Sequence, residues 1–421
     1  MKTSVTRREF AALLGLGAAW PFAARLGASD GQMNFRIRTI TAGIPLRSAS
    51  NLAPAQAAVA FLQRARGVFE AEGYEVQTLR LATQPLYDYL PDWTAPSSLQ
   101  ALKVLDQFAQ DNNVVCSIGP VITGDHHHPA FAAWAAELIR QTKNLSFSCR
   151  VASPAHGIHV KALRPAAEAI HAITSATPGG EGNFRFAATA FIPSGTPFFP
   201  AAWFDQGTSF SIGLESPNLL AEAFQGSQGL NDAKRRLKTR MEAALGPVAG
   251  RANKLAQSAG WSYLGIDVSP APGLDASIGR AIETLTRAPF GSSSTLAACA
   301  AITDVLKGLS IKTCGYSGLM LPVLEDPVLA QRAAEGRYGI SELLLYSSVC
   351  GTGLDVVPLP GDTSVDALTA IIADMAALAT KYRKPLSARL FPIPGKQAGE
   401  RVSFDNPFLT ESVVMPTVSS R

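Results

Sequence analysis

Short apolar segments alternate with helical segments along most of the chain. The extended segments either alternate with a period of two, as at 35–41, or are apolar throughout, as at 114–118. The helical segments often begin at Pro, Ser or Asp and carry apolar residues along one stripe. About ten strands interleaved with helices predict an α/β fold with a mostly parallel sheet covered on both faces.

The positions of these segments can be assigned from the same pattern. The expected strands are 35–41, 75–81, 114–118, 145–151, 184–191, 209–214, 262–268, 313–322, 354–359 and 386–391. The expected helices are 54–72, 97–111, 129 onward, 162–175, 217–224, 232–244, 276–285, 295–309, 326–335 and 365–382. No low-complexity linker or repeat of solenoid period divides them. We therefore expect residues 29–421 to form one large α/β barrel rather than two domains.

The composition is typical of a chain that buries much of its length. Of 421 residues, 47% are hydrophobic and 17% are charged, and the net charge is +4. This balance excludes a broadly basic surface for nucleic acid. No later segment offers the ~20 apolar residues that a membrane-spanning helix needs. The low charge fraction leaves room for a homo-oligomer interface.

The first 28 residues have the anatomy of a twin-arginine signal peptide. Arg7-Arg8 precedes a short apolar stretch, and Ala28 would suit a signal peptidase. The alternative, an amphipathic helix of a cytoplasmic protein, would be interrupted at Pro21. The sequence therefore predicts recognition by the twin-arginine export machinery and a periplasmic or otherwise exported mature chain that begins near Ser29.

Six segments together resemble one protein family. The segments are 37–44 (IRTITAGI), 197–201 (PFFPA), 211–215 (SIGLE), 266–272 (IDVSPAP), 317–326 (SGLMLPVLED) and 350–363 (CGTGLDVVPLPGDT). As a set they resemble domain of unknown function 711, also called uncharacterised protein family 0210. The likeness extends over nearly the whole of the expected mature chain.

This resemblance implies a fold but no activity, because the family is uncharacterised. Its members resemble the ten-stranded α/β barrel of pyruvate formate-lyase and anaerobic ribonucleotide reductase. Radical enzymes of that fold carry a glycine in an Arg-Val-x-Gly-Tyr type motif near the C-terminus, whereas here Arg401-Val402 is followed by Ser403 and Phe404. We therefore expect no glycyl radical. Cys350 is a candidate for the interior loop cysteine of such barrels.

Carboxylates near the ends of expected strands are the first candidates for catalysis. Function in parallel barrels gathers at the loops after the strand carboxyl ends, where desolvation raises the pKa of a carboxyl group and suits it to acid–base work. Asp267 and Glu215 occupy such positions. Glu215 could instead interact with the dipole of the next helix, whereas Asp267 has fewer structural alternatives. Asp355 begins its strand and is a candidate ligand-binding group.

Cys350 is the candidate nucleophile. The Gly351-Thr352-Gly353 turn after it would direct backbone N–H groups at an anion near the thiol, and His156 is the candidate base. The alternative is a buried thiol, because cysteine is among the most buried residue types. The five cysteines show no Cys-x-x-Cys spacing, and one or two disulfides after export stay open.

Arg38, Tyr316 and Ser317 are further candidate ligand-binding residues. An inward Arg38 would clamp a carboxylate or phosphate, whereas an outward one would only be solvated. Tyr316 and Ser317 would line the same mouth. The run at 125–128 (DHHH) offers adjacent metal ligands, but a closed site needs three or four. A solvated loop is the simpler interpretation, and we assign neither a metal ligand nor a cofactor.

These patterns favour an exported barrel enzyme that acts on a small polar organic molecule by non-radical acid–base or thiol chemistry. The alternative is an exported small-molecule-binding protein without turnover. An enzyme should bring titratable groups within hydrogen-bonding reach in one concave pocket. A pure binder would suit an aromatic-lined cavity with scattered polar contacts.

Overall fold

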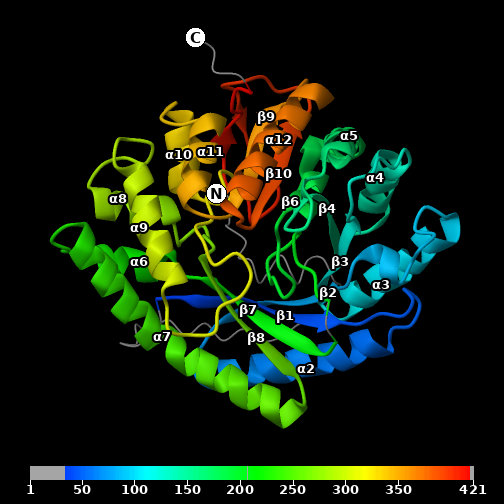
Figure 1. Ribbon diagram of the computed structural model, residues 1–421, viewed down its shortest axis with the longest axis horizontal. Coiled ribbons are helices and arrows are strands. Elements are labelled where there is room, and N and C mark those ends of the chain that lie inside the picture. The colour runs from blue at the N-terminus through cyan, green and yellow to red at the C-terminus, as the bar shows by residue number, and fades with distance from the viewer. Residues whose placement is uncertain (1–33, 206, 418–421) are drawn as a thin grey trace, which may run out of the picture.

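The computed structural model describes residues 34–205 and 207–417. The segment that we interpret as a signal peptide, residues 1–28, lies outside the described residues. In the described part, strands and helices alternate along the chain as the sequence pattern predicts (Figure 1).

One large sheet organises the structure. Its strands are β1 (Arg36–Ile44), β2 (Val76–Thr83), β3 (Val115–Ile122), β4 (Leu145–Ser153), β5 (Gly157–Ile158), β6 (Phe186–Ala190), β7 (Ser209–Glu215), β8 (Ser262–Pro270), β9 (Gly353–Pro360) and β10 (Leu386–Ile393). The order is β8-β7-β1-β2-β3-β4-β6-β10-β9, and the short β5 pairs with β4. A small separate hairpin joins β11 (Arg401–Val402) to β12 (Ser412–Val413).

The strand directions divide the sheet into three parallel blocks. The central strands β1, β2, β3, β4 and β6 are mutually parallel. On one side β7 is antiparallel to β1 and carries β8 parallel to itself. On the other side β10 is antiparallel to β6 and carries β9 parallel to itself. The structure thus confirms a single α/β domain with a mostly parallel sheet.

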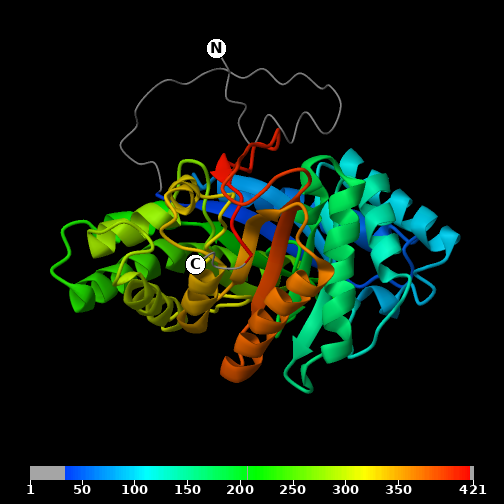
Figure 2. The ribbon, with the colours of Figure 1, turned by 90° about the horizontal axis from the view of Figure 1, so that it is seen from above.

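Helices surround the strands on the outside of the molecule (Figures 1 and 2). They are α2 (Ala53–Glu70), α3 (Pro96–Asp111), α4 (Phe131–Gln141), α5 (Val160–Ala176), α6 (Pro217–Phe224), α7 (Leu230–Ala259), α8 (Ile278–Thr286), α9 (Thr295–Lys307), α10 (Pro327–Ala334), α11 (Ile340–Val349) and α12 (Val365–Tyr382), with the short 3-10 segments η1 (Leu86–Asp88) and η2 (Pro178–Arg185). Among the helices of residues 34–205 and 207–417, none combines the length and the hydropathy of a transmembrane segment.

The two faces of the sheet have different roles. In β2, the buried Leu79 and Leu81 belong to the main hydrophobic core, whereas Thr78 and Arg80 line an internal cavity. The same alternation occurs in β10, where Ser387 and Arg389 face the cavity between core residues. Successive side chains of a strand point to opposite faces, so one face packs against helices and the other is left for polar groups.

Segment 313–322 differs from its prediction as a strand. Only single bridges form there: Thr313 pairs with Ile266 of β8, and Pro322 pairs with Asp355 of β9. Between them the backbone turns, with positive φ at Gly315 (62°) and Ser317 (42°). Positive φ breaks the extended geometry that a strand ladder requires.

Two helices also differ from the predicted pattern. Helix α7 continues past residue 244 and contains Pro247 in its interior, and α11 was not predicted. In α7, Leu237, Met241 and Val248 are fully buried on one face. Burial of this apolar stripe outweighs the local cost of a proline inside the helix.

Candidate functional site

A cavity of about 450 Å³ lies on the polar face of the sheet. Its lining comes from most strands of the sheet and from the loops that cross them. The strand residues are Arg38 of β1, Thr78 and Arg80 of β2, Val115 of β3, Leu145 and Ser146 of β4, Ala187 of β6, Asp355 of β9, and Ser387 and Arg389 of β10. Loop residues that line it include Phe198, Phe199, Tyr316, Met320 and Glu325.

The cavity lies beside the first residues of several central strands. Arg38, Val115 and Ser146 each fall within the first few residues of their strands. Its lining also includes segments that follow strand ends, because Ala271 and Pro272 come directly after β8, and Phe198 and Phe199 come after β6. The expectation that function gathers at the loops after the strand carboxyl ends therefore stays a prediction.

Arg38 and Arg389 share one buried carboxylate at this site. The Arg389 Nη2 lies 2.6 Å from Glu325 Oε1, and the Arg38 Nη2 lies 3.1 Å from Glu325 Oε2. Arg389 also donates from Nε to Asp355 Oδ1 at 2.7 Å. All three side chains of the central group, Arg38, Glu325 and Arg389, are less than one-tenth exposed. The structure therefore contains a continuous chain of alternating buried charges.

The chain of charges continues to the surface through Glu215. Arg38 Nη1 donates to Glu215 Oε2 at 2.7 Å, and Arg36 Nη1 donates to Glu215 Oε1 at 2.6 Å. Arg36 in turn pairs with the exposed Asp275. Glu215 is the last residue of β7, one residue past the expected end of this strand. Its carboxylate contacts the arginines of β1. Its expected catalytic role stays a prediction.

Burial shifts the protonation of this cluster. For Asp355, desolvation raises the pKa, and the charge of Arg389 opposes the shift without cancelling it. For Arg389, burial lowers the pKa, but the charges of Asp355 and Glu325 outweigh it and the net pKa is raised. A buried charge is stable only when it is paired and hydrogen-bonded. Arg389 therefore stays charged, and burial makes the Asp355 carboxyl group easier to protonate than an ordinary aspartate.

Glu325 is held in place by its neighbour Asp326. The Asp326 carboxylate accepts from the backbone N–H groups of Val328 and Leu329 at the start of α10. It also accepts from Ser277 Oγ at 2.6 Å and from Ile278 N at 2.7 Å at the start of α8. One carboxylate thus caps two helices. Fixing the backbone at residue 326 fixes the direction in which Glu325 enters the cavity.

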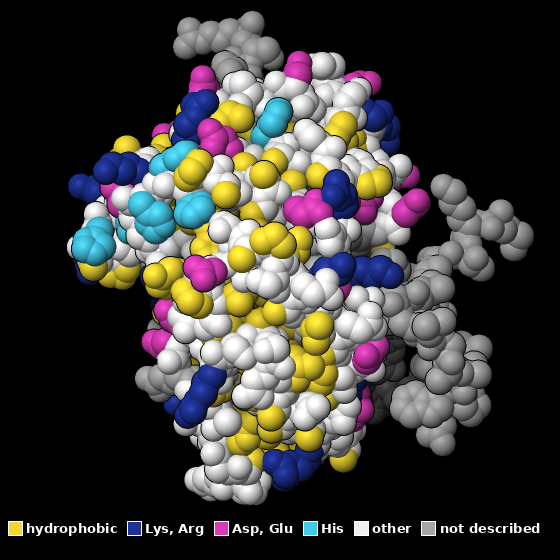
Figure 3. Space-filling model, turned by 90° about the vertical axis from the view of Figure 1, so that its right-hand side faces the viewer, with side chains coloured by type: hydrophobic (Ala, Val, Ile, Leu, Met, Phe, Trp, Pro, Cys, Tyr) yellow, Lys and Arg dark blue, Asp and Glu magenta, His cyan; other side chains and the backbone are white. Residues whose placement is uncertain are grey.

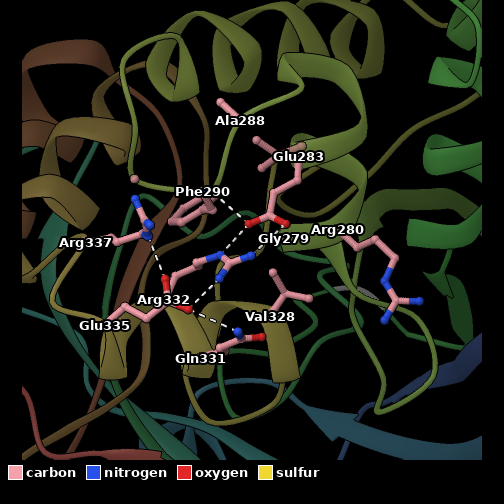
Figure 4. A network of polar contacts seen from close by, with 12 residues as sticks. Gly279, Arg280, Glu283, Ala288, Phe290, Val328, Gln331, Arg332, Glu335 and Arg337 are labelled. Atoms are coloured by element: carbon pink, nitrogen blue, oxygen red, sulfur yellow. Dashed lines mark hydrogen bonds and ion pairs between the residues drawn. The ribbon is translucent and has the colours of Figure 1, made fainter.

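A polar network on the outside ties the same two helices together (Figure 4). Arg332 of α10 donates from Nε to Glu283 Oε1 of α8 at 2.6 Å, and from Nη1 to Glu335 Oε1 at 2.6 Å. Arg337 adds a bond to the other oxygen of Glu335. Because α8 and α10 are joined at both Asp326 and Glu283, their relative position is well determined.

Tyr316 brings a hydroxyl into the cavity. Its Oη donates to Ser387 Oγ at 2.9 Å, and its ring is buried. Burial raises the pKa of Tyr316, and the nearby charge of Asp355 raises it further. The hydroxyl is therefore protonated at neutral pH and can donate a hydrogen bond. Tyr316 and Asp355, two of the predicted ligand-binding residues, both line the cavity, and Arg38 points inward to join them.

Asp267 is fully buried and is not among the residues that line the cavity. Its Oδ1 accepts from Ser269 Oγ at 2.6 Å and from Ser317 N at 2.9 Å, and its Oδ2 accepts from Tyr316 N at 2.8 Å. Burial raises its pKa despite these bonds. These contacts are those of a positioning residue that holds the turn carrying Tyr316. Ser317 belongs to the same turn, where its Oγ donates to the carbonyl of Cys314.

Cys350 and His156 occupy different environments. Cys350 is 1% exposed, and Lys384 donates to its carbonyl. Contact with the Cys350 side chain, together with burial, raises the pKa of Cys299 well above its usual value. His156 lies in the exposed turn between β4 and β5. Among the described residues, the structure records no contact that brings His156 to Cys350, and it records all five cysteines as free thiols.

Histidine side chains gather on one outer face of the molecule (Figure 3). His127 approaches Glu168 of α5 at 3.8 Å, with both side chains partly exposed. Within residues 34–205 and 207–417, no group of three or more His, Cys, Asp or Glu side chains is arranged to hold a metal ion. In the run before α4, residues 125–127 are exposed, whereas His128 is partly buried and packs against Trp93.

Several residues of the site were missed by sequence reasoning. Glu325, Arg389 and Arg80 form much of the charged wall, yet none was selected. A signal existed for Arg389, because it interrupts an otherwise apolar strand at a position two residues from Ser387. For Glu325 the sequence gives only its place beside Asp326, since its partners lie 287 and 64 residues away.

The fold and the cavity define a class of protein: a single α/β domain with a mostly parallel sheet, one face of which carries a cavity lined by apolar and charged side chains. Residues 31–406 match the family described as "Uncharacterised ACR (DUF711)", and the chain belongs to this family. The family resemblance inferred from the six sequence segments is thereby confirmed.

Its relatives come from both archaea and bacteria. A UPF0210 protein of Pyrobaculum aerophilum is 31% identical over 348 residues, which cover 78% of this chain and 76% of the relative. A UPF0210 protein of Syntrophobacter fumaroxidans is 28% identical over 375 residues, covering 83% and 80%. One from Desulforudis audaxviator is 26% identical over 409 residues, covering 88% of each chain.

Proposed function

We propose that the protein is an enzyme that acts on a small polar organic molecule bound in the cavity, by non-radical acid–base chemistry. The observation that carries this proposal is the meeting of Tyr316 and Asp355 at one cavity beside the buried chain Arg38–Glu325–Arg389. Concave sites with convergent titratable groups and shifted pKa values are typical of active sites.

The two titratable groups suit complementary roles. Tyr316, whose pKa is raised, keeps its proton, and its hydroxyl can donate a hydrogen bond to a carbonyl or to a developing oxyanion in place of Ser387 Oγ. Asp355 accepts the Arg389 bond at Oδ1, and the described residues form no recorded hydrogen bond to its Oδ2. This oxygen is the candidate base. Its raised pKa brings its basicity closer to neutral pH, which favours proton abstraction.

Acid–base chemistry has better support than thiol chemistry. All five cysteines belong to the described residues, and none lines the cavity. Cys350 is buried, and the exposed His156 is not recorded in contact with it. A thiol nucleophile needs a base within hydrogen-bonding reach.

The test is turnover by the purified chain. A fractionated pool of small polar metabolites is incubated with the wild type, and consumption is followed by mass spectrometry. Tyr316→Phe and Asp355→Asn should each abolish consumption of the substrate that the wild type removes. The matched controls are Tyr382→Phe and Asp366→Asn, both on exposed side chains, which should leave turnover unchanged. Full turnover by both cavity variants would refute the proposal.

Binding without turnover is the second candidate, and the aromatic wall of the cavity favours it. Phe184, Phe198, Phe199 and Phe408 line the cavity, and Arg80 lies over the Phe199 ring with its Cζ 5.0 Å from the centroid. Such walls suit capture of a ligand with an apolar body. A metabolite that binds stoichiometrically and is recovered unchanged would support this candidate.

We also propose that the sheet closes into a barrel of the pyruvate formate-lyase-like type. The bridges of Thr313 to β8 and of Pro322 to β9 support closure, because they connect segment 313–322 to both ends of the strand order. The antiparallel joins on either side of the central block are consistent with this arrangement. An experimental structure with an open gap between β8 and β9 would contradict it.

Export remains a proposal that rests on the sequence of residues 1–28. The family match begins at residue 31, which leaves this leader outside the family domain and supports its role as a signal. N-terminal sequencing of the protein from the periplasmic fraction should give a chain that starts near Ser29. A retained Met1 in the cytosolic fraction would overturn the proposal.

A further inference from the structure

A second group of basic side chains lines the cavity at the edge formed by β2, β3, β4 and η2. Arg80, Lys143 and Arg185, together with the hydroxyl group of Ser146, form this group, which we call the basic end. The strand register brings them together, since Arg80 pairs with Val115 in β3, Cys116 pairs with Leu145 in β4, and Phe147 pairs with Phe186. The basic end is therefore built on adjacent strands.

Arg185 is a buried guanidinium at this end whose recorded hydrogen bonds go to uncharged groups. Its Nη1 donates to Thr142 Oγ1 at 3.0 Å and to the Leu145 carbonyl at 2.9 Å, and its Nη2 donates to the Ile139 carbonyl. All three acceptors are neutral. Burial lowers the pKa of Arg185 to about 10, so the guanidinium keeps its charge at neutral pH.

Two carboxyl groups lie near this end. The Asp106 carboxylate accepts from the backbone N–H groups of residues 143 to 145, and its charge partly offsets the lowering of the Arg185 pKa by burial. Glu181 also lines the cavity, but burial raises its pKa and the charge of Asp405 raises it further. The cavity lining at this end therefore carries three basic side chains, Arg80, Lys143 and Arg185, and one carboxyl group, Glu181, beside an apolar wall.

Ser146 gives an independent indication of a ligand. It is 4% exposed, it lines the cavity, and its Oγ has no hydrogen-bond partner among the described residues. A buried hydroxyl without a partner costs stability unless a ligand or water satisfies it. Ser146 lies on β4 beside Arg185, so its hydroxyl without a hydrogen-bond partner belongs to the basic end.

We propose that the basic end binds an oxyanion group, a carboxylate or a phosphate, of the small organic molecule that occupies the cavity. This inference rests on the proposed function, because it assumes that the cavity is the ligand site. The bound oxyanion would accept from Ser146 Oγ and from the guanidinium and ammonium groups. The apolar body would lie along the phenylalanine wall, and the reacting part would face Tyr316 and Asp355.

The test compares charged and neutral probes by isothermal titration calorimetry with the purified chain. Benzoate should bind, whereas benzamide, which has the same ring without the charge, should bind at least about tenfold more weakly. Inorganic phosphate is the parallel probe. Preference for phosphate would identify a phosphate ester, and preference for benzoate would identify a carboxylate. Equal affinity for benzoate and benzamide, or no saturable binding of either anion, would overturn the inference.

Two variants locate the binding. Lys143→Met, on an exposed side chain, and Ser146→Ala should each weaken binding of the preferred anion by about threefold. Lys161→Met, on an exposed lysine outside the lining, is the matched control and should leave the affinity unchanged. Unchanged affinity in both cavity variants would overturn the inference.

The same measurements separate this inference from the proposed function. Tyr316→Phe should lose turnover while it keeps its affinity for the anion. If an anion binds in a Lys143-dependent way and Tyr316→Phe and Asp355→Asn both retain turnover, only the proposed function fails. If those variants lose turnover and a neutral probe binds as well as its charged counterpart, only the anion site fails.

Discussion

Arg389 and Glu325 form a 2.6 Å ion pair in which both side chains are less than one-tenth exposed. The two residues lie 64 positions apart, and Arg38, from the first strand, joins the same carboxylate from another direction. Three distant segments thus depend on one glutamate, which links the stability of the domain to the geometry of its cavity.

Glu325→Gln should destabilise the fold strongly. The neutral amide leaves two buried guanidinium groups with less compensating charge, and we expect a loss of about 3 kcal/mol in the free energy of unfolding. Urea unfolding monitored by circular dichroism measures it. The control Asp366→Asn removes an exposed partner of Arg164 and should change stability by less than about 1 kcal/mol. Equal effects of the two substitutions would contradict the central role of Glu325.

Asp267→Asn should destabilise the turn that carries Tyr316. The amide NH2 group would face backbone N–H groups that now donate to the carboxylate. We expect this to cost about 1–3 kcal/mol in the free energy of unfolding. Thermal and urea unfolding give the overall loss, and hydrogen exchange at Tyr316 and Ser317 should increase locally. An unchanged exchange rate at these amides would show that Asp267 does not hold the turn.

Asp326→Ala should loosen α8 and α10 together. The substitution removes the cap of α10 and the Asp326 bonds to the first N–H groups of α8, where Ser277 still accepts from Arg280 N, and we expect a cost of about 2 kcal/mol or more. Ser364→Ala, which removes one exposed cap at the start of α12, is the matched control and should cost about 1 kcal/mol. A smaller loss in Asp326→Ala than in Ser364→Ala would be inconsistent with the double cap.

The pH dependence of turnover should report on Asp355. If its carboxylate is the base, activity is present where the group is ionised and falls as the pH drops through its pKa. Because burial raises that pKa above the ordinary aspartate value of 3.8, the acid limb of kcat/KM should lie above the usual aspartate range. The limb should be absent from any residual activity of Asp355→Asn. If the acid limb of kcat/KM persists unchanged in this variant, a group other than Asp355 is responsible for it.

Local sequence determined most of the secondary structure. The period-two pattern at 35–41 and the apolar runs at 114–118 and 386–391 all became strands of the predicted α/β sheet. They did so because a short apolar run with β-branched residues is stable as a strand covered by helices. Segment 313–322 did not, since buried acceptors at Asp267 and Ser269 bind its N–H groups and turn the backbone.

Only the tertiary structure decided which charged residues meet. Sequence reasoning selected Arg38, Tyr316 and Asp355, which line the cavity, and it ranked Asp267 first. Asp267 is not among the lining residues and binds the turn that carries Tyr316, and its catalytic role stays a prediction. It did not select Glu325 or Arg389. The physical reason is that side-chain periodicity tells which face of a strand a residue occupies, whereas an ion pair between strands depends on strand order and register. Those are fixed by the packing of the whole sheet, which no local pattern contains.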